Sequence, residues 1–286
     1  RKAEQYVSYL YPYSIPYYRR KGWEIMSDHI TFTLKDTEIP ETVELPGHVE
    51  RLPVGDEDVK GTYDRFARCT HGALIRNDFE WMEYWRWENE EERTAAVYYD
   101  AKDIPQGFLL YWVEEDVFHI REMVYLTQEA RKGLWNFIRA HYSMIDAVKG
   151  HIYTGEPLAF LLDESQIQET IEPYFMARIV DVAQFLRLYP FEGSIRPFHF
   201  VVTDPMAEWN NGIFSVATDR EGTVSVTDEP AGKAVELDIQ TLSAMLMGYK
   251  RPSYLARIER LHTDKRTLRL LEEIIPDGQP YFSDYF

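Results

Sequence analysis

The sequence has little cysteine, no long apolar run and few positive charges. Its 286 residues include a single cysteine, Cys69, which excludes an internal disulfide and fits a reducing compartment. We expect Cys69 to be a small buried residue. No apolar run approaches the ~20 residues needed to cross a bilayer, and no basic-then-apolar leader opens the sequence. We therefore expect a cytoplasmic protein without a membrane partner.

Positive charge is outnumbered, with 31 Lys and Arg against 48 Asp and Glu and a formal net charge of -17. Nucleic acid is disfavoured as a partner, because phosphate backbones bind basic faces. An acidic chain attracts cations such as polyamines, lysine side chains or cationic antibiotics. Many cytosolic proteins are acidic merely for solubility, and the charge by itself favours that simpler interpretation.

Motifs of the common metal, hydrolase and nucleotide sites are also missing. The histidines are scattered, with no His-Glu-x-x-His and no cysteine pair, so no metal site is predicted. There is no Gly-x-Ser-x-Gly elbow and no phosphate-binding loop with Gly-Lys-Ser or Gly-Lys-Thr. These absences narrow the function classes without naming one.

Composition and apolar patterning divide the chain into four stretches. Residues 1–35 contain strand-like runs around a short helix, and residues 36–58 are rich in Pro, Glu and Asp without an apolar period, which is typical of a linker. Residues 59–174 combine helices with strands and predict an α/β domain around a mixed sheet. Residues 175–286 combine short strands with closing helices and predict an α+β domain.

Several elements have recognisable boundaries. Ser14 can cap a short helix whose left-handed end falls at Gly22. An aromatic-rich helical segment is expected over residues 63–87, and Asp238 and Ser253 are expected to cap two of the closing helices. Period-two patterns and β-favouring residues predict strands at 6–10, 30–34, 95–99, 108–113, 117–126, 151–154, 198–203, 212–218 and 223–227.

The segment YLYPYSIPYYRRKGWE, residues 9–24, is the most unusual in composition. Taken alone it indicates an aromatic cluster in which Lys and Arg stems stack on rings. It also resembles the last strand, helix and strand of a GNAT acetyltransferase domain in enhanced-intracellular-survival (Eis) proteins. In that family a tyrosine spaced as Tyr-x-x-x-Gly-aromatic protonates the departing CoA thiolate. Tyr18 matches, with Gly22 and Trp23 following, and Tyr17 is the neighbour that could be mistaken for it.

The resemblance implies further roles near this helix and at the other end of the sequence. It places Tyr13 and Ser14 near acetyl-CoA. The final residues, 280–286, are strongly aromatic, so we expect them to be docked rather than frayed. In the family they resemble, the terminal phenylalanine, Phe286 here, inserts into the first domain and its α-carboxylate is the general base. A carboxylate of pKa ~3.5 is weak for this task unless it is desolvated, acts through a water, or mainly orients the amine.

The same resemblance identifies the remaining stretches. Residues 1–35 resemble the end of a first GNAT domain, residues 59–174 a second GNAT domain, and residues 175–286 a sterol-carrier-protein-like domain. Where an active domain has Arg/Gln-x-x-Gly-x-Gly/Ala, this chain has Glu129-Ala-Arg-Lys-Gly-Leu-Trp135, whose single glycine, Gly133, predicts a degenerate copy. The front of the first domain is missing by this comparison, so we expect an N-terminally truncated chain that is inactive alone.

The function implied by the resemblance is N-acetyl transfer. The acetyl group would pass from acetyl-CoA to a primary amine of a cationic substrate, such as an aminoglycoside, a polyamine or a lysine, without a metal. The family also implies a homo-oligomer, a hexamer. The alternative is a non-enzymatic protein that binds lipid or another small molecule in its sterol-carrier-like domain.

Overall fold

The computed structural model of the chain describes residues 4–86, 94–153, 157–193, 195–218 and 223–285. Contacts divide the chain into two compact units. Unit 1 contains residues 1–27 and 173–280, and unit 2 contains residues 28–172 and 281–286. The chain therefore passes from one unit to the other three times. The domain boundaries expected at residues 35, 58 and 174 stay a prediction, because compact units defined by contacts need not coincide with domains defined by family resemblance.

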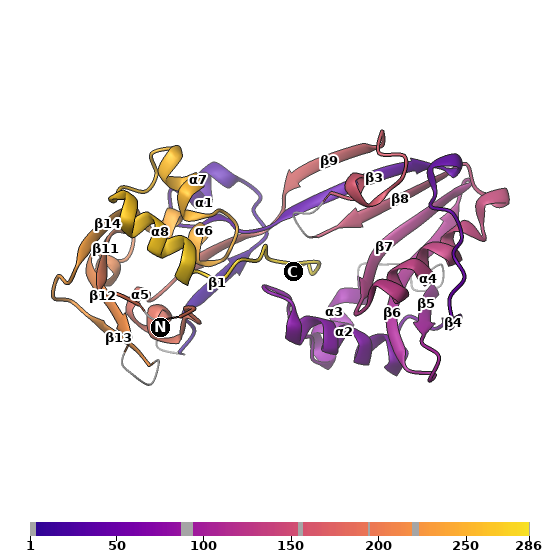
Figure 1. Cartoon of the computed structure of the whole chain (residues 1–286), viewed down its shortest axis with the longest axis horizontal. Coiled ribbons are helices and arrows are strands. Elements are labelled where there is room, and N and C mark those ends of the chain that lie inside the picture. Colours follow the sequence, from indigo (N-terminus) through magenta and orange to yellow (C-terminus); the bar gives the residue numbers. More distant parts are fainter. Residues whose placement is uncertain (1–3, 87–93, 154–156, 194, 219–222, 286) are drawn as a thin grey trace. The chain divides into compact units, whose positions relative to one another are not determined.

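Unit 2 is built on a seven-stranded sheet with the order β4-β5-β6-β7-β8-β3-β9 (Figure 1). β7 and β8 pair in parallel, whereas the pairs on the β4 side of β7 and the pair of β3 with β8 are antiparallel. Burial of alternate residues fits this arrangement in β3 and β7, whose inward side chains are apolar with one exception in β7. The strands are β3 (Asp28–Lys35), β4 (His48–Leu52), β5 (Thr94–Tyr99), β6 (Pro105–Glu114), β7 (Val117–Tyr125), β8 (Ala147–Ile152) and β9 (Gln168–Pro173).

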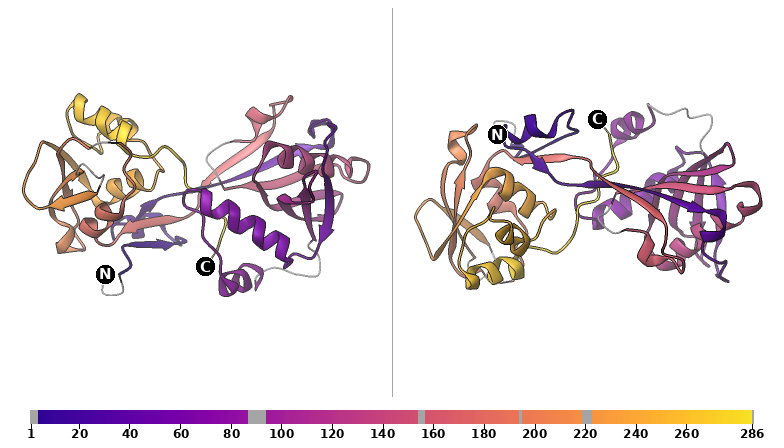
Figure 2. Two further views of the ribbon diagram at one scale, coloured as in Figure 1. Left: turned by 60° about the horizontal axis from the view of Figure 1, so that its bottom comes forward. Right: turned by 90° about the horizontal axis from the view of Figure 1, so that it is seen from above.

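Helices cover both faces of the unit 2 sheet. α4 (Gln128–Arg139) packs Leu134 and Ile138 into one apolar core, and α2 (Glu57–Cys69) and α3 (Asp78–Arg86) pack into a second core on the opposite face. Figure 2 shows α2 lying along the sheet. A sheet with helices on both faces is an α/β layer structure, as the sequence predicted for this region.

Two expectations for unit 2 need revision. The helical segment expected over residues 63–87 is two helices, because Gly72 takes a left-handed φ of 78° and the Asn77 side chain accepts hydrogen bonds from the first amides of α3. Residue 87 lies outside the described residues. The stretch 36–58 is more than a linker, since β4 pairs with β5 at the sheet edge. An edge strand has one neighbour, so it can lack a clear apolar period.

The described residues of unit 1 contain two sheets and five α-helices. The larger sheet has the order β13-β12-β11-β14, with β11 and β14 parallel, and the smaller sheet has the order β1-β10-β2. α6 is buried on nearly all sides. The elements are β1 (Val7–Leu10), α1 (Ile15–Arg19), β2 (Glu24–Ile25), β10 (Met176–Ile179), α5 (Val182–Leu188), β11 (Phe198–Thr203), β12 (Gly212–Thr218), β13 (Val224–Thr227), β14 (Lys233–Asp238), α6 (Ile239–Leu246), α7 (Pro252–Arg257) and α8 (Lys265–Ile274).

The predicted helix caps have mixed outcomes. Asp238 caps α6 by accepting from the Thr241 amide, so that prediction is confirmed. Ser14 precedes α1 in extended conformation, but its hydroxyl makes no capping bond. The cap of α7 is Arg251 rather than Ser253, because Pro252 occupies the first helical position, where its missing N–H costs nothing. Cys69 was expected to be buried, but it ends α2 on the exposed side.

The described residues contain no helix long and apolar enough to cross a membrane. Among the same residues, no three His, Cys, Asp or Glu side chains gather in a way that could hold a metal ion.

Candidate active site

Tyr18 lies in a cluster of tyrosine rings at the start of unit 1. The Tyr13, Tyr17 and Tyr18 rings contact one another, with centroid separations of 5.2 to 5.6 Å. The Tyr18 backbone is fixed at both ends, because its amide donates to the Ser14 carbonyl and its own carbonyl accepts from Lys21 and Trp23. The structure thus brings together three predicted site residues, Tyr13, Ser14 and Tyr18.

An open pocket of about 570 Å³ borders Tyr18 in unit 1. The Tyr18 hydroxyl makes no hydrogen bond with any described residue, so its proton is available to a ligand. Tyr13 is 75% exposed, so little of the protein holds its ring in place. The pocket is lined by Ser8, Tyr17, Tyr18, Lys21, Trp23, Arg178, Val180, Met206, Ala207 and Trp209.

Arg178 fixes one wall of this pocket. Its guanidinium donates to the Asp204 carboxylate at 2.6 Å and to the Lys21 carbonyl, and it lies 5.1 Å from the centre of the Trp23 ring. Gly22 is required here for two reasons. Its φ is 92°, and an added Cβ would lie 2.3 Å from the Arg178 guanidinium. The glycine of the Tyr-x-x-x-Gly-aromatic spacing therefore has a local structural cause.

The last described residues of the chain are packed into unit 2. We call residues 281–285 the tail. Tyr281 and Phe282 are buried, as the docking prediction required, whereas Tyr285 is 48% exposed. The Tyr281 amide donates to the His71 carbonyl at 2.9 Å, and its ring meets Phe66 of α2 edge-on. Phe286, the predicted base, lies outside the described residues.

A buried charge cluster binds the tail. The Arg76 guanidinium donates to the Asp284 carboxylate at 2.7 Å and to the Ser283 hydroxyl at 3.0 Å. It also faces the Glu122 carboxylate at 3.4 Å. The Ser283 hydroxyl in turn donates to Glu122, so it joins the two charges. All four side chains are almost entirely shielded from solvent.

Tyrosines complete the cluster. The Tyr84 hydroxyl donates to Glu122 at 2.8 Å, and the Tyr281 hydroxyl donates to the other Glu122 oxygen. The Arg76 guanidinium lies 3.8 Å from the ring centres of both Tyr63 and Tyr84. Stacking of this kind stabilises a desolvated cation by up to about 2 kcal/mol. The cluster is therefore satisfied by hydrogen bonds and by aromatic faces.

The two carboxyls respond differently to this environment. Burial opposes ionisation of Glu122, but Arg76 and the donating hydroxyls outweigh it and hold its pKa below the usual value. Burial raises the pKa of Asp284, because Arg76 offsets only part of the desolvation. One arginine thus faces two buried carboxyls, and Glu122 is the one whose charge is better stabilised.

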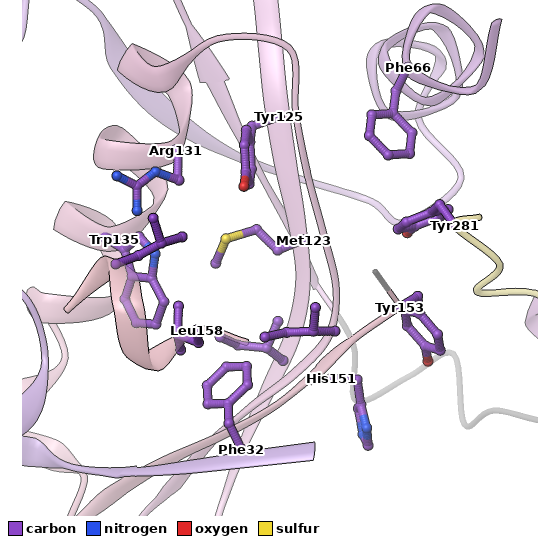
Figure 3. A pocket seen from close by; sticks show the side chains of 13 residues that line it. Phe32, Phe66, Met123, Tyr125, Arg131, Trp135, His151, Tyr153, Leu158 and Tyr281 are labelled. Atoms are coloured by element: carbon purple, nitrogen blue, oxygen red, sulfur yellow. The ribbon is translucent and has the colours of Figure 1, made fainter. Parts of the chain in front are cut away.

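An apolar pocket lies beside the tail in unit 2. The parallel pairing of β7 and β8 ends at Ile120 and Gly150, although β7 continues to Tyr125. Past that point a pocket of about 170 Å³ opens, with Trp135 and Arg131 of α4 on one side and Tyr281 of the tail on the other (Figure 3). The tail thus contributes to an apolar wall as well as to the charge cluster.

The start of α4 does not fit a pyrophosphate. An added Cβ on Gly133 would lie 2.2 Å from the Tyr98 ring, so this glycine serves packing. Glu129 accepts from the Tyr98 hydroxyl and places a negative charge in the first turn, where a phosphate would be repelled. The Ala130 amide already donates a hydrogen bond to the Thr127 hydroxyl. The start of α4 therefore lacks the free amides and the small residues that a pyrophosphate-binding loop needs.

Sequence reasoning missed Arg76 and Glu122. A signal existed for Glu122, because it occupies an inward position of β7 between Ile120 and Val124, where the alternation calls for an apolar residue. Arg76 lies between α2 and α3, in a segment without a pattern. Its partners on the tail are more than 200 residues away in the sequence, so no local reading could pair them.

Two family models match consecutive parts of the chain. The family model of the acetyltransferase (GNAT) domain matches residues 72–179, and that of the sterol carrier protein domain matches residues 182–283. The N-acetyltransferases Eis of Mycobacterium tuberculosis and Mycobacterium bovis are 24% identical over 233 residues, covering 78% of this chain. The aligned part is 55% of their own length, so the chain spans about half the length of the curated relatives it matches.

Solved structures agree with this assignment. A probable N-acyltransferase from Enterococcus faecalis is 30% identical to this chain and superposes with a TM-score of 0.91. The match covers 100% of this chain and 73% of the Enterococcus chain. A GCN5-related N-acetyltransferase from Anabaena variabilis is 25% identical with a TM-score of 0.87, covering 100% and 74%. Eis1 from Mycobacterium abscessus, at 18% identity and a TM-score of 0.80 over 100% and 74%, shares the fold. The chain therefore belongs to the Eis-type family of GNAT N-acetyltransferases.

Proposed function

We propose that the protein transfers an acetyl group from acetyl-CoA to a primary amine of a cationic substrate, with Tyr18 as the general acid and the α-carboxylate of Phe286 as the base. Beyond family membership, the observation that supports this proposal is the burial of the tail. Four consecutive residues, 281–284, are buried, which a terminus without a role does not require.

The chemistry requires two proton transfers. The neutral amine attacks the thioester carbonyl, the C–S bond breaks, and the sulfur leaves with the bonding electrons. A phenol of pKa ~10 can protonate that thiolate, whose conjugate thiol has a pKa of ~8.5. The unbonded Tyr18 hydroxyl is suited to this donation. The proton lost by the amine goes to the carboxylate of Phe286, directly or through a water, and the same group orients the amine.

Acetyl-CoA is assigned to the Tyr18 region rather than to unit 2. The start of α4 does not fit a pyrophosphate, whereas the pocket beside Tyr18 has two cations in its lining, Lys21 and Arg178. Tyr13 and Ser14 adjoin Tyr18 and are proposed to contact the donor. Acceptors are proposed to be aminoglycosides, polyamines or lysine side chains, which the net charge of -17 would attract.

Two further assignments stay proposals. The family resemblance favours a homo-oligomer, a hexamer, which sedimentation of the purified protein tests directly. The lipid-carrier alternative gains little support from unit 1, because a groove of about 810 Å³ there has Arg196, Lys233, Arg266 and Arg269 in its lining. Cations on a groove do not make the apolar tunnel that a sterol needs.

Acetylation of a panel of amines by the complete gene product tests the proposal. Tyr18→Phe should lower kcat by about 10²-fold or more, the usual contribution of a positioned acid. Tyr254→Phe on α7, outside the lining of the pocket beside Tyr18, is the matched control and should leave kcat nearly unchanged. One residue added after Phe286 should have the same effect as Tyr18→Phe, because it moves the carboxylate. Full activity in both variants would contradict the site assignment, and inactivity of the wild type on every amine would favour the binding-protein alternative.

A further inference from the structure

The charge cluster of unit 2 needs the tail for its neutralisation. Arg76 donates hydrogen bonds to three side chains, of which Asp284 and Ser283 belong to the tail. Glu122 accepts from Tyr281 and Ser283 of the tail and from Tyr84 and Arg76 of the unit itself. A released tail would therefore deprive a buried cation and a buried carboxylate of half or more of their hydrogen-bonding partners.

Such a loss is costly in a buried site. Glu122 has no exposed surface, and Arg76 is only 7% exposed. Removing one partner of a buried ion pair leaves an uncompensated charge in a medium that cannot solvate it. The penalty opposes release of the tail far more strongly than a surface ion pair would. The tail is thus a fixed part of unit 2 rather than a mobile arm.

The position of the anchor limits where the chain can end. Asp284 precedes Phe286 by two residues. Two extended residues span at most about 7 Å, so an anchored Asp284 limits how far from it the proposed base can reach. A base or orienting group on an unanchored tail would lose rate, because a misplacement of even about 1 Å can cost 10²-fold.

We propose that Arg76 and Glu122 are positioning residues, which hold Ser283 and Asp284 in a charge clamp and thereby fix the place of the terminal carboxylate. This inference rests on the proposed function. Neither residue needs to touch a substrate, since each acts through the tail. A purely structural role would instead lower the stability of unit 2 and leave the turnover of the folded enzyme unchanged.

Digestion with a carboxypeptidase tests the clamp without any assay of activity. In the wild type, removal of residues should stop after Tyr285, because Asp284 and Ser283 are buried. Glu122→Gln and Arg76→Lys keep the tail sequence unchanged, so a difference in digestion reports docking alone. We expect digestion to continue to Pro280 in both variants, so that mass spectrometry shows the additional loss of residues 281–284.

Matched controls exist on α2 of the same unit. Glu57→Gln and Arg68→Lys alter exposed ion pairs with Lys60 and Asp64, and both should digest like the wild type. Ser283→Ala is the mildest variant, because it keeps every charge and removes only the joining hydroxyl. It guards against a result in which the charge variants fail to fold. Digestion of all three clamp variants that stops after Tyr285 would overturn the inference.

Kinetics of the complete gene product test the positioning role. Clamp variants should lower kcat by on the order of 10²-fold while the KM for acetyl-CoA stays within about twofold. If the variants release the tail but keep their kcat, the clamp has no positioning role, and the inference fails while Tyr18→Phe can still support the proposed function. If the wild type acetylates no amine, the proposed function and the positioning role both fail. The digestion result then still decides whether the tail is clamped.

Discussion

Single side chains decide how closely the elements of unit 2 approach. Gly133 shows this most clearly, because an added Cβ would overlap the Tyr98 ring at 2.2 Å, and the same ring carries the hydroxyl that bonds Glu129. The phosphate-loop pattern of active GNAT domains also asks for a glycine in this loop. Gly133 therefore has a packing role that does not depend on phosphate binding.

Gly133→Ala should destabilise unit 2 by about 1–3 kcal/mol, because overpacking outweighs the higher helix propensity of alanine. Gly61→Ala in α2 is the matched control. An added Cβ there meets nothing within 4 Å, so it should stabilise the protein by about 0.5–1 kcal/mol. Urea unfolding measures both changes. A Gly133→Ala protein as stable as the Gly61→Ala protein would contradict the packing explanation.

Strands and helices were predictable to different degrees. The sequence predicts β3 from the spacing of Ile30, Phe32 and Leu34, because apolar and polar residues alternate in a strand that buries only one face. The edge strand β4 was not recognised, because a strand at the edge of a sheet need not show an alternation of apolar and polar residues. The break between α2 and α3 was not recognised either, because it depends on the left-handed φ of Gly72. In the candidate site, the role of Tyr18 was predicted from family resemblance. The contacts of Arg76 with Ser283 and Asp284 could not be predicted, because they form only when the tail packs against unit 2.

The pairing of β3 with β8 brings two histidines together. Nε2 of His29 lies 2.7 Å from Nδ1 of His151, so the pair shares one proton in that bond. Burial lowers the pKa of His29 below 6.5, and Arg121 lowers it further. The unfolded chain then binds more protons than the folded one below about pH 6.5. Stability of unit 2 should be fully present above that pH and should fall as the pH decreases through the folded pKa.

Urea unfolding between pH 7.5 and 5 measures this dependence. His29→Gln should reduce the loss of unfolding free energy on acidification, because the perturbed group is gone. His48→Gln is the control on the exposed edge strand β4 and should retain the wild-type pH dependence. An unchanged slope in His29→Gln would assign the pH dependence to other groups.

At the scale of the whole molecule, the net charge should affect how fast the proposed cationic acceptors meet the protein. The net charge of -17 attracts polycations over about 10 Å at 0.1 M salt. Raising the salt from 0.05 to 0.5 M should therefore lower kcat/KM for a polyamine several-fold, mainly through KM. A singly charged small amine should show a much smaller change. Equal salt dependence for both acceptors would show that the field of the molecule does not steer the substrate.

Because the chain passes between the units three times, neither unit is complete when its first segment has been synthesised. Unit 1 lacks β14, α6 and α8 until residues 28–172 of unit 2 have been synthesised, although β1 and β2 precede those residues. Residues 281–285 follow every other described element. Glu122 and Arg76 can meet Ser283 and Asp284 only after every other described element has been synthesised. Loss of residues 281–285 alone would thus leave two unmatched buried charges, which quality-control proteases can recognise.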